Sequence, residues 1–356
     1  MELAEKQTPV LILGGGVAGL AAARELARRG VACVLAEREP VLGGRARGFA
    51  CKATTACARC GACRVGDLLA ELAARPEAEL FTCAGAVAAR RDRGRWQVEL
   101  APQPGEGAEP FPARALGERL ALTCRAVILA VGYSPFDPRA KSRFGYGRVP
   151  GVISALELEA MLAQDTLAGP RGEPPRRVAF IQCVGSRDQS LGHLYCSRVC
   201  CGYALRMAGR IRHTWPESEV SFFHMDLQTY GRAWEEALPE LRRQVHLVRA
   251  MPGEVTRGED DTPQVVYSDP AGRHHREPFD LVVLSVGLRP PKAASALAEM
   301  FGLEPGPDGF LQDGPEVFVA GCAQGPRGIV ESMDHAARAA AAALRLLDSG
   351  REAAHG

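Results

Sequence analysis

The stretch Val10-Leu-Ile-Leu-Gly14-Gly-Gly-Val-Ala-Gly19 decides the fold expected for this chain. Its four leading apolar residues predict a buried strand, and Gly14, Gly16 and Gly19 have the G-x-G-x-x-G spacing of a dinucleotide-binding turn. The first glycine permits a tight turn, the second lets backbone approach a pyrophosphate, and the third lets helix and strand pack closely. A second buried strand follows and ends at Glu37, whose carboxylate can bind ribose hydroxyls. We therefore predict a βαβ dinucleotide-binding unit.

Composition excludes several classes of function. The 356 residues include 43 Lys and Arg against 42 Asp and Glu, so the formal charge of +1 favours neither nucleic acid nor an acidic membrane surface as a partner. Apolar residues at 46% and charged residues at 24% are typical of a globular protein. The chain shows no secretory signal, and its apolar runs are too short to span a bilayer. We expect a cytoplasmic protein that does not span a membrane.

Twelve cysteines are the unusual feature of the composition. In a reducing compartment, clustered cysteines indicate metal or redox sites rather than disulfides. A first group has the spacing C-x12-C-x3-C-C and consists of Cys183, Cys196, Cys200 and Cys201. Four thiolates at a strand end and a helix start suit a [4Fe-4S] cluster, in which each iron takes one cysteine. Zinc and unligated thiols are the alternatives.

Three further stretches resemble flavoproteins that have two dinucleotide-binding domains. They are the Gly-Gly-Arg turn at 43–45, the strand ending at Gly132, and the strand ending at Gly321-Cys322, where that family normally has Gly-Asp. The resemblance implies FAD as a cofactor. The residues expected to bind it are Gly14, Gly16, Ala18, Gly19, Glu37, Arg38, Gly44, Arg45, Val131, Gly132, Gly321 and Cys322.

A second cysteine group directly follows the Gly-Gly-Arg turn and consists of Cys51, Cys57, Cys60 and Cys63. Its C-x2-C-x2-C spacing is the core of a ferredoxin-type cluster site and predicts a second cluster. Glutathione-reductase-like enzymes, however, have a redox disulfide at this place in the chain, so Cys57 and Cys60 also fit a dithiol that exchanges electrons with FAD. A zinc knuckle is the third interpretation.

Strands expected at 177–182, 219–223 and 281–286, with a helix near 200–211, predict a second dinucleotide-type fold. Its phosphate loop is replaced by the segment from Cys183 to Asp188, so we expect poor NAD(P)H binding there. The predicted fold is α/β, with two interleaved dinucleotide-binding (Rossmann-like) domains of the FAD/NAD(P)-linked reductase type. We expect an FAD-binding domain over 1–150 plus 303–356, an inserted domain over 176–301 that carries the iron–sulfur cluster, and a surface loop at 103–112.

The segments Ala179-Phe-Ile-Gln-Cys-Val-Gly-Ser-Arg-Asp188 and Tyr195-Cys-Ser-Arg-Val-Cys-Cys201 closely resemble the A subunit of heterodisulfide reductase (HdrA) and its shorter relatives. The stretches 126–138, 145–158 and 320–326 resemble the same family. The resemblance implies an FAD- and iron–sulfur-containing electron-transfer protein in sulfur and disulfide redox metabolism, active within a complex. It also implies the first cysteine group as cluster ligands, and as partners the other subunits of such a complex, an electron carrier and a second copy of the chain.

Two departures from that family refine the expectation. The chain lacks the ferredoxin-like inserts of the long members, so it resembles the short ones, and electron bifurcation is not expected of it. Five residues after Cys201 the family commonly has Lys, whereas this chain has Arg206. We predict that Arg206 lies over the flavin ring and stabilises its reduced anion. The alternative function is a stand-alone NAD(P)H-dependent flavoprotein disulfide reductase that uses Cys57 and Cys60.

Overall fold

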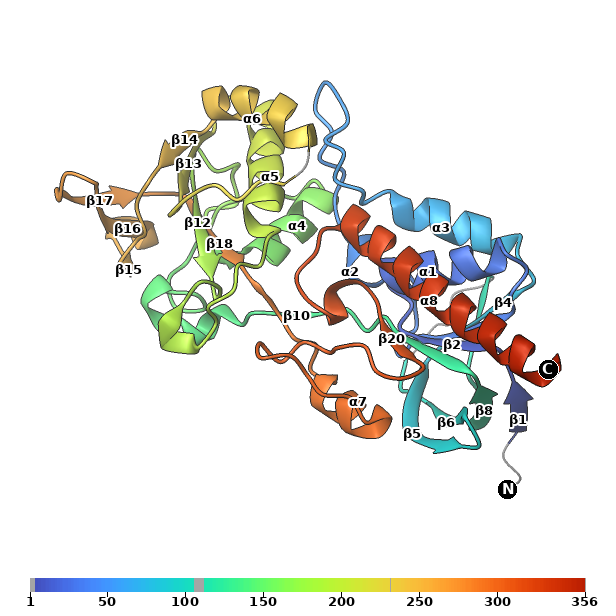
Figure 1. Ribbon diagram of the computed structural model, residues 1–356. Coiled ribbons are helices and arrows are strands. Elements are labelled where there is room, and N and C mark those ends of the chain that lie inside the picture. Colours follow the sequence, from blue (N-terminus) through green and yellow to red (C-terminus); the bar gives the residue numbers. More distant parts are fainter. Residues whose placement is uncertain (1–3, 106–111, 231, 356) are drawn as a thin grey trace. The chain divides into compact units, whose positions relative to one another are not determined.

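The computed structural model describes residues 4–105, 112–230 and 232–355 (Figure 1). Most of the surface loop expected at 103–112 therefore lies outside the described residues. The chain divides into two compact units. Unit 1 comprises Met1–Arg47, Gly61–Ser134 and Arg289–Gly356, and unit 2 comprises Gly48–Cys60 and Pro135–Leu288.

Unit 1 is built on a six-stranded sheet in which every neighbouring pair is parallel. Its central strands consist of apolar residues that are buried on both faces, as parallel sheets covered by helices require. In spatial order the strands are β20 (Val317–Val319), β9 (Ala126–Leu129), β2 (Val10–Leu13), β3 (Cys33–Ala36), β4 (Ala78–Thr82) and β7 (Ala113–Ala115).

A second sheet and five helices complete unit 1. The sheet has the spatial order β1 (Ala4–Gln7), β8 (Leu120–Cys124), β6 (Arg95–Pro102) and β5 (Ala84–Asp92). The helices are α1 (Val17–Ala27), α2 (Gly44–Arg47), α3 (Arg64–Ala73), α7 (Ala294–Phe301) and α8 (Ile329–His355). Helix α1 packs against both α3 and α8 (Figure 1).

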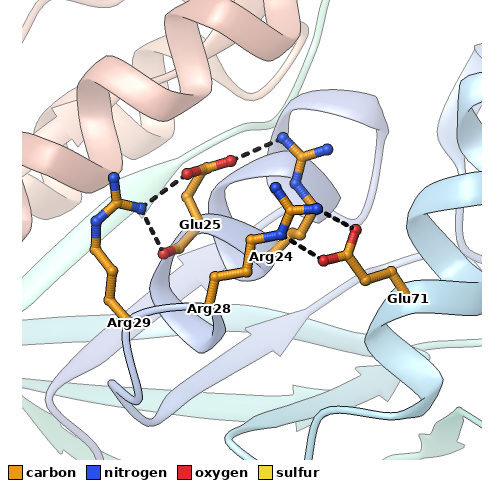
Figure 2. Close-up of polar contacts among 5 residues, drawn as sticks. All are labelled: Arg24, Glu25, Arg28, Arg29 and Glu71. Atoms are coloured by element: carbon orange, nitrogen blue, oxygen red, sulfur yellow. Dashed lines mark hydrogen bonds and ion pairs between the residues drawn. The ribbon is translucent and has the colours of Figure 1, made fainter.

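Ion pairs join α1 to α3 at the surface of unit 1 (Figure 2). Arg28, just after α1, makes two hydrogen bonds to Glu71 of α3, at 2.5 and 3.0 Å. On α1 and just beyond it, Glu25 pairs with both Arg24 and Arg29, each at 2.8 Å. Ion pairs at the surface contribute little to stability, so the buried apolar face of α1 fixes its position and the ion pairs add to it.

Unit 2 is built on a five-stranded sheet that is also parallel throughout. Its strands, in spatial order, are β11 (Val152–Ser154), β18 (Leu281–Val286), β12 (Arg177–Val184), β13 (Glu219–Phe223) and β14 (His246–Val248). Its helices are α4 (Ala155–Ala163), α5 (Cys200–Thr214) and α6 (Arg232–Gln244). An antiparallel sheet of β15 (Glu254–Arg257), β16 (Pro263–Ser268) and β17 (His274–Pro278) follows in the chain.

The remaining elements are short. A two-stranded sheet is formed by β10 (Ser134–Pro135) and β19 (Leu288–Arg289). Single 3-10 turns are η1 (Pro138–Ala140), η2 (Ser142–Phe144), η3 (Gln189–Leu191), η4 (Glu259–Asp261) and η5 (Gly321–Ala323). Within the described ranges, no helix combines the length and the apolar character that crossing a membrane requires.

The expected fold class is confirmed: two parallel sheets, each with a strand–turn–helix connection at its carboxyl edge, share one chain. The observed strands at 10–13, 219–223 and 281–286 have the expected bounds. The strand expected at 177–182 extends two residues further, and the helix expected at 200–211 extends three residues further. The expected domain ranges stay a prediction, and the compact units differ from them at three places. Unit 2 includes 48–60, and its longer part begins at Pro135 because Phe136 and Phe144 are buried in its core. That longer part ends at Leu288, so 289–301 belong to unit 1.

Candidate cofactor and sulfur sites

The glycine turn of unit 1 leaves no space for a side chain at Gly14 or at Gly19. Gly14 follows β2 with φ +105°, and a Cβ atom there would lie 2.5 Å from the carbonyl oxygen of Ala130. A Cβ atom on Gly19 would lie 1.8 Å from the carbonyl oxygen of Gly14. Gly16 caps α1 without a side-chain hydrogen bond, so the first amides of the helix point at whatever lies before it. Such a helix start is a binding site for phosphate groups.

The Gly-Gly-Arg turn is joined to this glycine turn. The amide of Gly43 donates to the carbonyl of Gly15 at 2.8 Å. Gly44 has φ +56°, and a Cβ atom there would lie 3.0 Å from the Cα atom of Gly16. Arg45 lies with its guanidinium carbon 5.2 Å from the centre of the Tyr133 ring. The two motifs, more than twenty residues apart in sequence, therefore form one backbone surface.

Glu37 reaches the same surface from the end of β3. One of its carboxylate oxygens accepts from the amide of Gly15 at 2.6 Å, and the other accepts from the amide of Glu39 at 2.8 Å. Burial raises the pKa of the Glu37 carboxyl, and the two amide hydrogen bonds oppose that shift. Arg38, beside it, is exposed and pairs with Glu39.

The remaining predicted FAD residues follow β9 and β20. Val131 and Gly132 follow β9 after one intervening residue, Ala130, and Gly132 has φ +72°. A Cβ atom on Gly321 would lie 2.7 Å from the side chain of Ala18. The thiol of Cys322 donates to the carbonyl of Arg327 at 3.2 Å, so in this structure it is occupied by its own loop.

These residues fit a dinucleotide cofactor. They lie at the carboxyl edge of the parallel sheet, where β2, β3, β9 and β20 all end, and a ligand in an open α/β sheet binds at that edge. The close glycine contacts provide bare backbone for a pyrophosphate, and Glu37 stands beside it for a ribose. The structure thus brings together the predicted residues of unit 1, with the exposed Arg38 at the margin.

The first cysteine group occupies the corresponding place in unit 2. Cys183 lies near the end of β12, and Cys200 and Cys201 begin α5. Cys196 lies in the connection between them. Cys200 and Cys201 are buried, whereas Cys183 and Cys196 are partly exposed. The thiols of Cys183, Cys196 and Cys201 all interact electrostatically with that of Cys200, so the four lie near one another.

The loop that carries these cysteines is strained. Cys183, Arg187 and Arg198 have φ values of +58°, +55° and +60°, although none of them is glycine. Each such residue costs on the order of 1 kcal/mol of folding free energy. Proteins retain this strain where other contacts fix the backbone, commonly at functional sites. Glycine at 185 is required as well, because a Cβ atom there would overlap the Phe136 ring at 2.1 Å.

Hydrogen bonds and one ion pair surround the sulfur atoms. The amide of Arg198 donates to the sulfur of Cys196 at 3.2 Å, and the amide of Gln228 donates to that of Cys201 at 3.4 Å. Arg187 forms an ion pair with Asp226, which follows β13. Asp226 and Gln228 were not among the residues predicted from the sequence. Their position after a strand neighbouring β12 was the available signal, because adjacent parallel strands end at one edge.

As free thiols, Cys183, Cys200 and Cys201 resist ionisation. Burial, followed by the neighbouring thiolate of Cys201, raises the pKa of Cys183 to about 12. Burial and the other three sulfurs raise the pKa of Cys200 well above its usual value, and burial raises the pKa of Cys201. Bound metal cations reverse this balance, since a coordinating thiol is deprotonated.

No three His, Cys, Asp or Glu side chains among the described residues are placed to hold a single metal ion. A cubane cluster makes a different demand, because each iron takes one cysteine and the sulfurs surround the cluster. Four mutually interacting thiols with amide donors directed at two of the sulfurs fit that donor set.

The second cysteine group is divided between the units. Cys51, Cys57 and Cys60 lie in the segment Gly48–Cys60 of unit 2, and Cys63 lies in unit 1 immediately before α3. Cys51, Cys57 and Cys63 are exposed, and Cys60 is partly exposed. All four are free thiols in this structure.

Arg206 is occupied within unit 2. Its Nε atom donates to the carbonyl of Ala58 at 3.0 Å, and its guanidinium carbon lies 4.3 Å from the centre of the Trp234 ring. Burial lowers the pKa of Arg206, and its attraction to Cys60 opposes that shift. The predicted role of Arg206 over a flavin ring stays a prediction.

Known proteins resemble this chain in both sequence and fold. The NAD(P)-binding Rossmann-like domain family matches residues 12–58. An iron-sulfur A subunit (number 2) of the CoB–CoM heterodisulfide reductase of Methanopyrus kandleri is 28% identical over 96% of this chain. The A subunit of the H2:CoB–CoM heterodisulfide,ferredoxin reductase of Methanothermobacter marburgensis is 30% identical over 94% of it. The chain belongs to the heterodisulfide reductase A-subunit family.

The chain spans 65% of the Methanopyrus protein and 63% of the Methanothermobacter protein, both A subunits of heterodisulfide reductases. Among solved structures, T. acidophilum thioredoxin reductase matches with a TM-score of 0.61 at 17% identity, covering 96% of this chain and 99% of that one. At that identity the likeness concerns the fold alone, which is that of the FAD/NAD(P)-linked disulfide reductases.

Proposed function

We propose that this member of the heterodisulfide reductase A-subunit family is an electron-transfer flavoprotein that carries FAD in unit 1 and a [4Fe-4S] cluster in unit 2, within a heterodisulfide-reductase-like complex. The observation that carries the proposal is the loop between β12 and α5. At the place where a dinucleotide-binding domain has its phosphate loop, this chain has four cysteines whose thiols interact electrostatically with one another.

Each cofactor has its own protein residues. Gly14, Gly16, Gly19 and the Gly43–Gly44 turn would hold the FAD pyrophosphate, with Glu37 at a ribose. Cys183, Cys196, Cys200 and Cys201 would each ligate one iron. When bound, FAD takes electrons in pairs and releases them singly, and the cluster takes them one at a time.

The surroundings of the four thiols indicate how the protein tunes that site. Amide donors on Cys196 and Cys201 stabilise negative charge on the sulfurs, and hydrogen bonds of this kind set the potential of iron–sulfur sites. The Arg187–Asp226 pair adds two opposite charges at the rim. The same cysteine-bearing loop leaves no bare glycine cradle after β12, which argues against NAD(P)H binding there.

The other parts of the proposal rest on the family. From the family resemblance we propose that the chain exchanges electrons with further subunits of a sulfur- or disulfide-metabolising complex and with an electron carrier. The same resemblance supports a dimer of this chain and a cytoplasmic location. A second cluster at Cys51, Cys57, Cys60 and Cys63 and a Cys57–Cys60 dithiol both stay open.

Anaerobic analysis of iron, acid-labile sulfide and flavin in the purified full chain tests the proposal. We expect one FAD and about four irons per chain, or about eight if the second group also holds a cluster. A chain with flavin but without iron after anaerobic reconstitution would refute the cluster, and one without flavin would refute the assignment of unit 1.

A further inference from the structure

The segment Gly48–Cys60, which carries three of the second-group cysteines, is fastened to unit 2 by three cationic side chains. Two of them, Arg206 and Arg210, lie one turn apart on α5. Arg210 donates to the carbonyl of Cys51 at 2.9 Å, and Arg206 donates to the carbonyl of Ala58 at 3.0 Å. The two carbonyls lie near opposite ends of the cysteine-bearing loop, so one helix holds it at both.

The third fastening is a buried ion pair. Lys52 is 5% exposed, donates to the carbonyl of Ala50 at 2.9 Å and pairs with Glu159 of α4, which is also 5% exposed. Ala50 itself is part of the core that includes Leu205 of α5. A lysine is almost never this buried without a partner, so the Lys52–Glu159 ion pair favours one position of the segment Gly48–Cys60.

The cysteines themselves stay accessible although their backbone is held. Cys51 and Cys57 are exposed and Cys60 is partly exposed. Arg206 brings a positive charge to this group, since its attraction to Cys60 opposes the effect of its own burial. Trp234 also holds the guanidinium, whose carbon lies 4.3 Å from the centre of the indole ring.

Helix α5 also begins with two residues of the first cysteine group, Cys200 and Cys201. At 1.5 Å per residue, Arg206 and Arg210 follow Cys201 by about 7.5 and 13.5 Å along the helix axis. We propose that Arg206 and Arg210 are positioning residues that bind the Cys51–Cys60 segment to α5, so that all the clustered cysteines of unit 2 belong to one rigid electron-transfer module. This inference rests on the proposed function, because it assigns a redox role to both groups.

The role of Arg206 differs from that of Arg210 in one respect. Arg206 is both a clamp and a positive charge beside Cys60, whereas Arg210 contacts the carbonyl of Cys51, Asp165 and Thr214. A positive charge stabilises the reduced, more negative state of a sulfur site. Loss of the Arg206 charge therefore lowers the midpoint potential of the second group, and loss of Arg210 leaves it nearly unchanged.

The test uses the full chain with Arg206→Gln, Arg210→Gln and the conservative Arg206→Lys. Arg212→Gln is the matched control, since Arg212 lies on the same helix and donates to the carbonyls of Pro216 and Ser218. Amide hydrogen exchange over residues 50–60 and alkylation of Cys57 and Cys60 by N-ethylmaleimide are followed by mass spectrometry.

Both Gln variants are expected to raise exchange in the segment about tenfold or more and to speed alkylation of Cys60, and the control is expected to change neither. Arg206→Gln makes the potential of the second group more negative, and Arg206→Lys restores it. Unchanged exchange in both Gln variants, equal acceleration in Arg212→Gln, or a Cys51–Cys60 segment without any redox activity would overturn the inference. Amide exchange and alkylation can be measured without flavin or cluster. They therefore test the positioning role of Arg206 and Arg210 even if the proposed function is wrong.

Discussion

The turn after β2 in unit 1 and the loop after β12 in unit 2 occupy the same place in their sheets. Each connects a buried parallel strand to a helix at the carboxyl edge. The first takes three residues, all glycine, between Leu13 and Val17, whereas the second takes fifteen between Val184 and Cys200. The first offers bare backbone and the second offers sulfur, so we propose that one topology serves two cofactor chemistries through the residues of a single connection.

The largest effect is expected when one cysteine of the group after β12 is replaced. Cys200→Ser is expected to abolish the cluster, because Cys200 is buried and is one of the four proposed iron ligands, while flavin content stays near one per chain. Iron and flavin analysis of the purified variant checks this. Cys33→Ala, in a strand of unit 1, is the control and is expected to keep both cofactors. Loss of flavin together with iron in Cys200→Ser would show that the two sites are not separable.

Filling the glycine turn is the reciprocal change. Gly19→Ala inserts a Cβ atom 1.8 Å from the carbonyl of Gly14 and forces strand and helix apart. Overpacking of this order is expected to weaken flavin binding about 10- to 100-fold while the iron content is unchanged. Isothermal titration of the apoprotein with FAD measures the change. Gly66→Ala is the control, since nothing lies within 4 Å of its Cβ position.

Charge at the rim of the cysteine loop should tune its potential without removing the cluster. Asp226→Asn leaves the Arg187 charge unopposed by its carboxylate and is expected to raise the one-electron potential, whereas Arg187→Gln is expected to lower it. Since the pair is partly exposed, the effect should be about 10–40 mV in each direction. An EPR-monitored redox titration measures it. Shifts of the same sign in both variants would contradict an electrostatic cause.

The smallest expected effect concerns the loop after β20. Burial, with Arg327 and Arg338 nearby, lowers the pKa of His335 to about 4, and its neutral Nδ1 atom accepts from the amide of Gly321 at 3.0 Å. His335 takes up a proton near pH 6.5 in the unfolded chain but only near pH 4 in the folded chain. Its contribution to the free energy of unfolding is therefore complete above pH 6.5 and is lost as the pH falls toward 4.

His335→Asn removes this titration. Between pH 7.5 and 4.5 the wild-type Tm is therefore expected to fall by about 2–4 °C more than that of the variant. Thermal unfolding at both pH values gives the comparison. An equal fall in the two proteins would show that His335 does not change its protonation on unfolding.

The elements at these two strand–helix connections could be predicted well from the sequence, because strong local signals act there. A four-residue apolar strand before three glycines has few alternatives, and the C-x12-C-x3-C-C spacing marks one segment. The sequence did not predict that the segment 48–60 belongs to unit 2. That membership depends on Lys52 finding Glu159 and on two arginines of α5 reaching backbone carbonyls, and these contacts join residues more than a hundred positions apart.

The partners of the sulfurs were also beyond reach of the sequence. Backbone amides of Arg198 and Gln228 carry no sequence signature, and the strained backbone at Cys183 arises only once the loop is folded. Asp226 is the exception, because a carboxylate three residues after an expected strand was visible.

A reductive titration with dithionite, followed by absorbance and EPR, tests most directly the claim that one chain holds both cofactors. FAD in unit 1 and a cluster in unit 2 together predict uptake of about three electrons per chain or more, including a one-electron step with an EPR signal. That step should vanish in Cys200→Ser and persist in Gly66→Ala. Uptake of two electrons without an EPR signal, identical in the wild type and in Cys200→Ser, would contradict the claim.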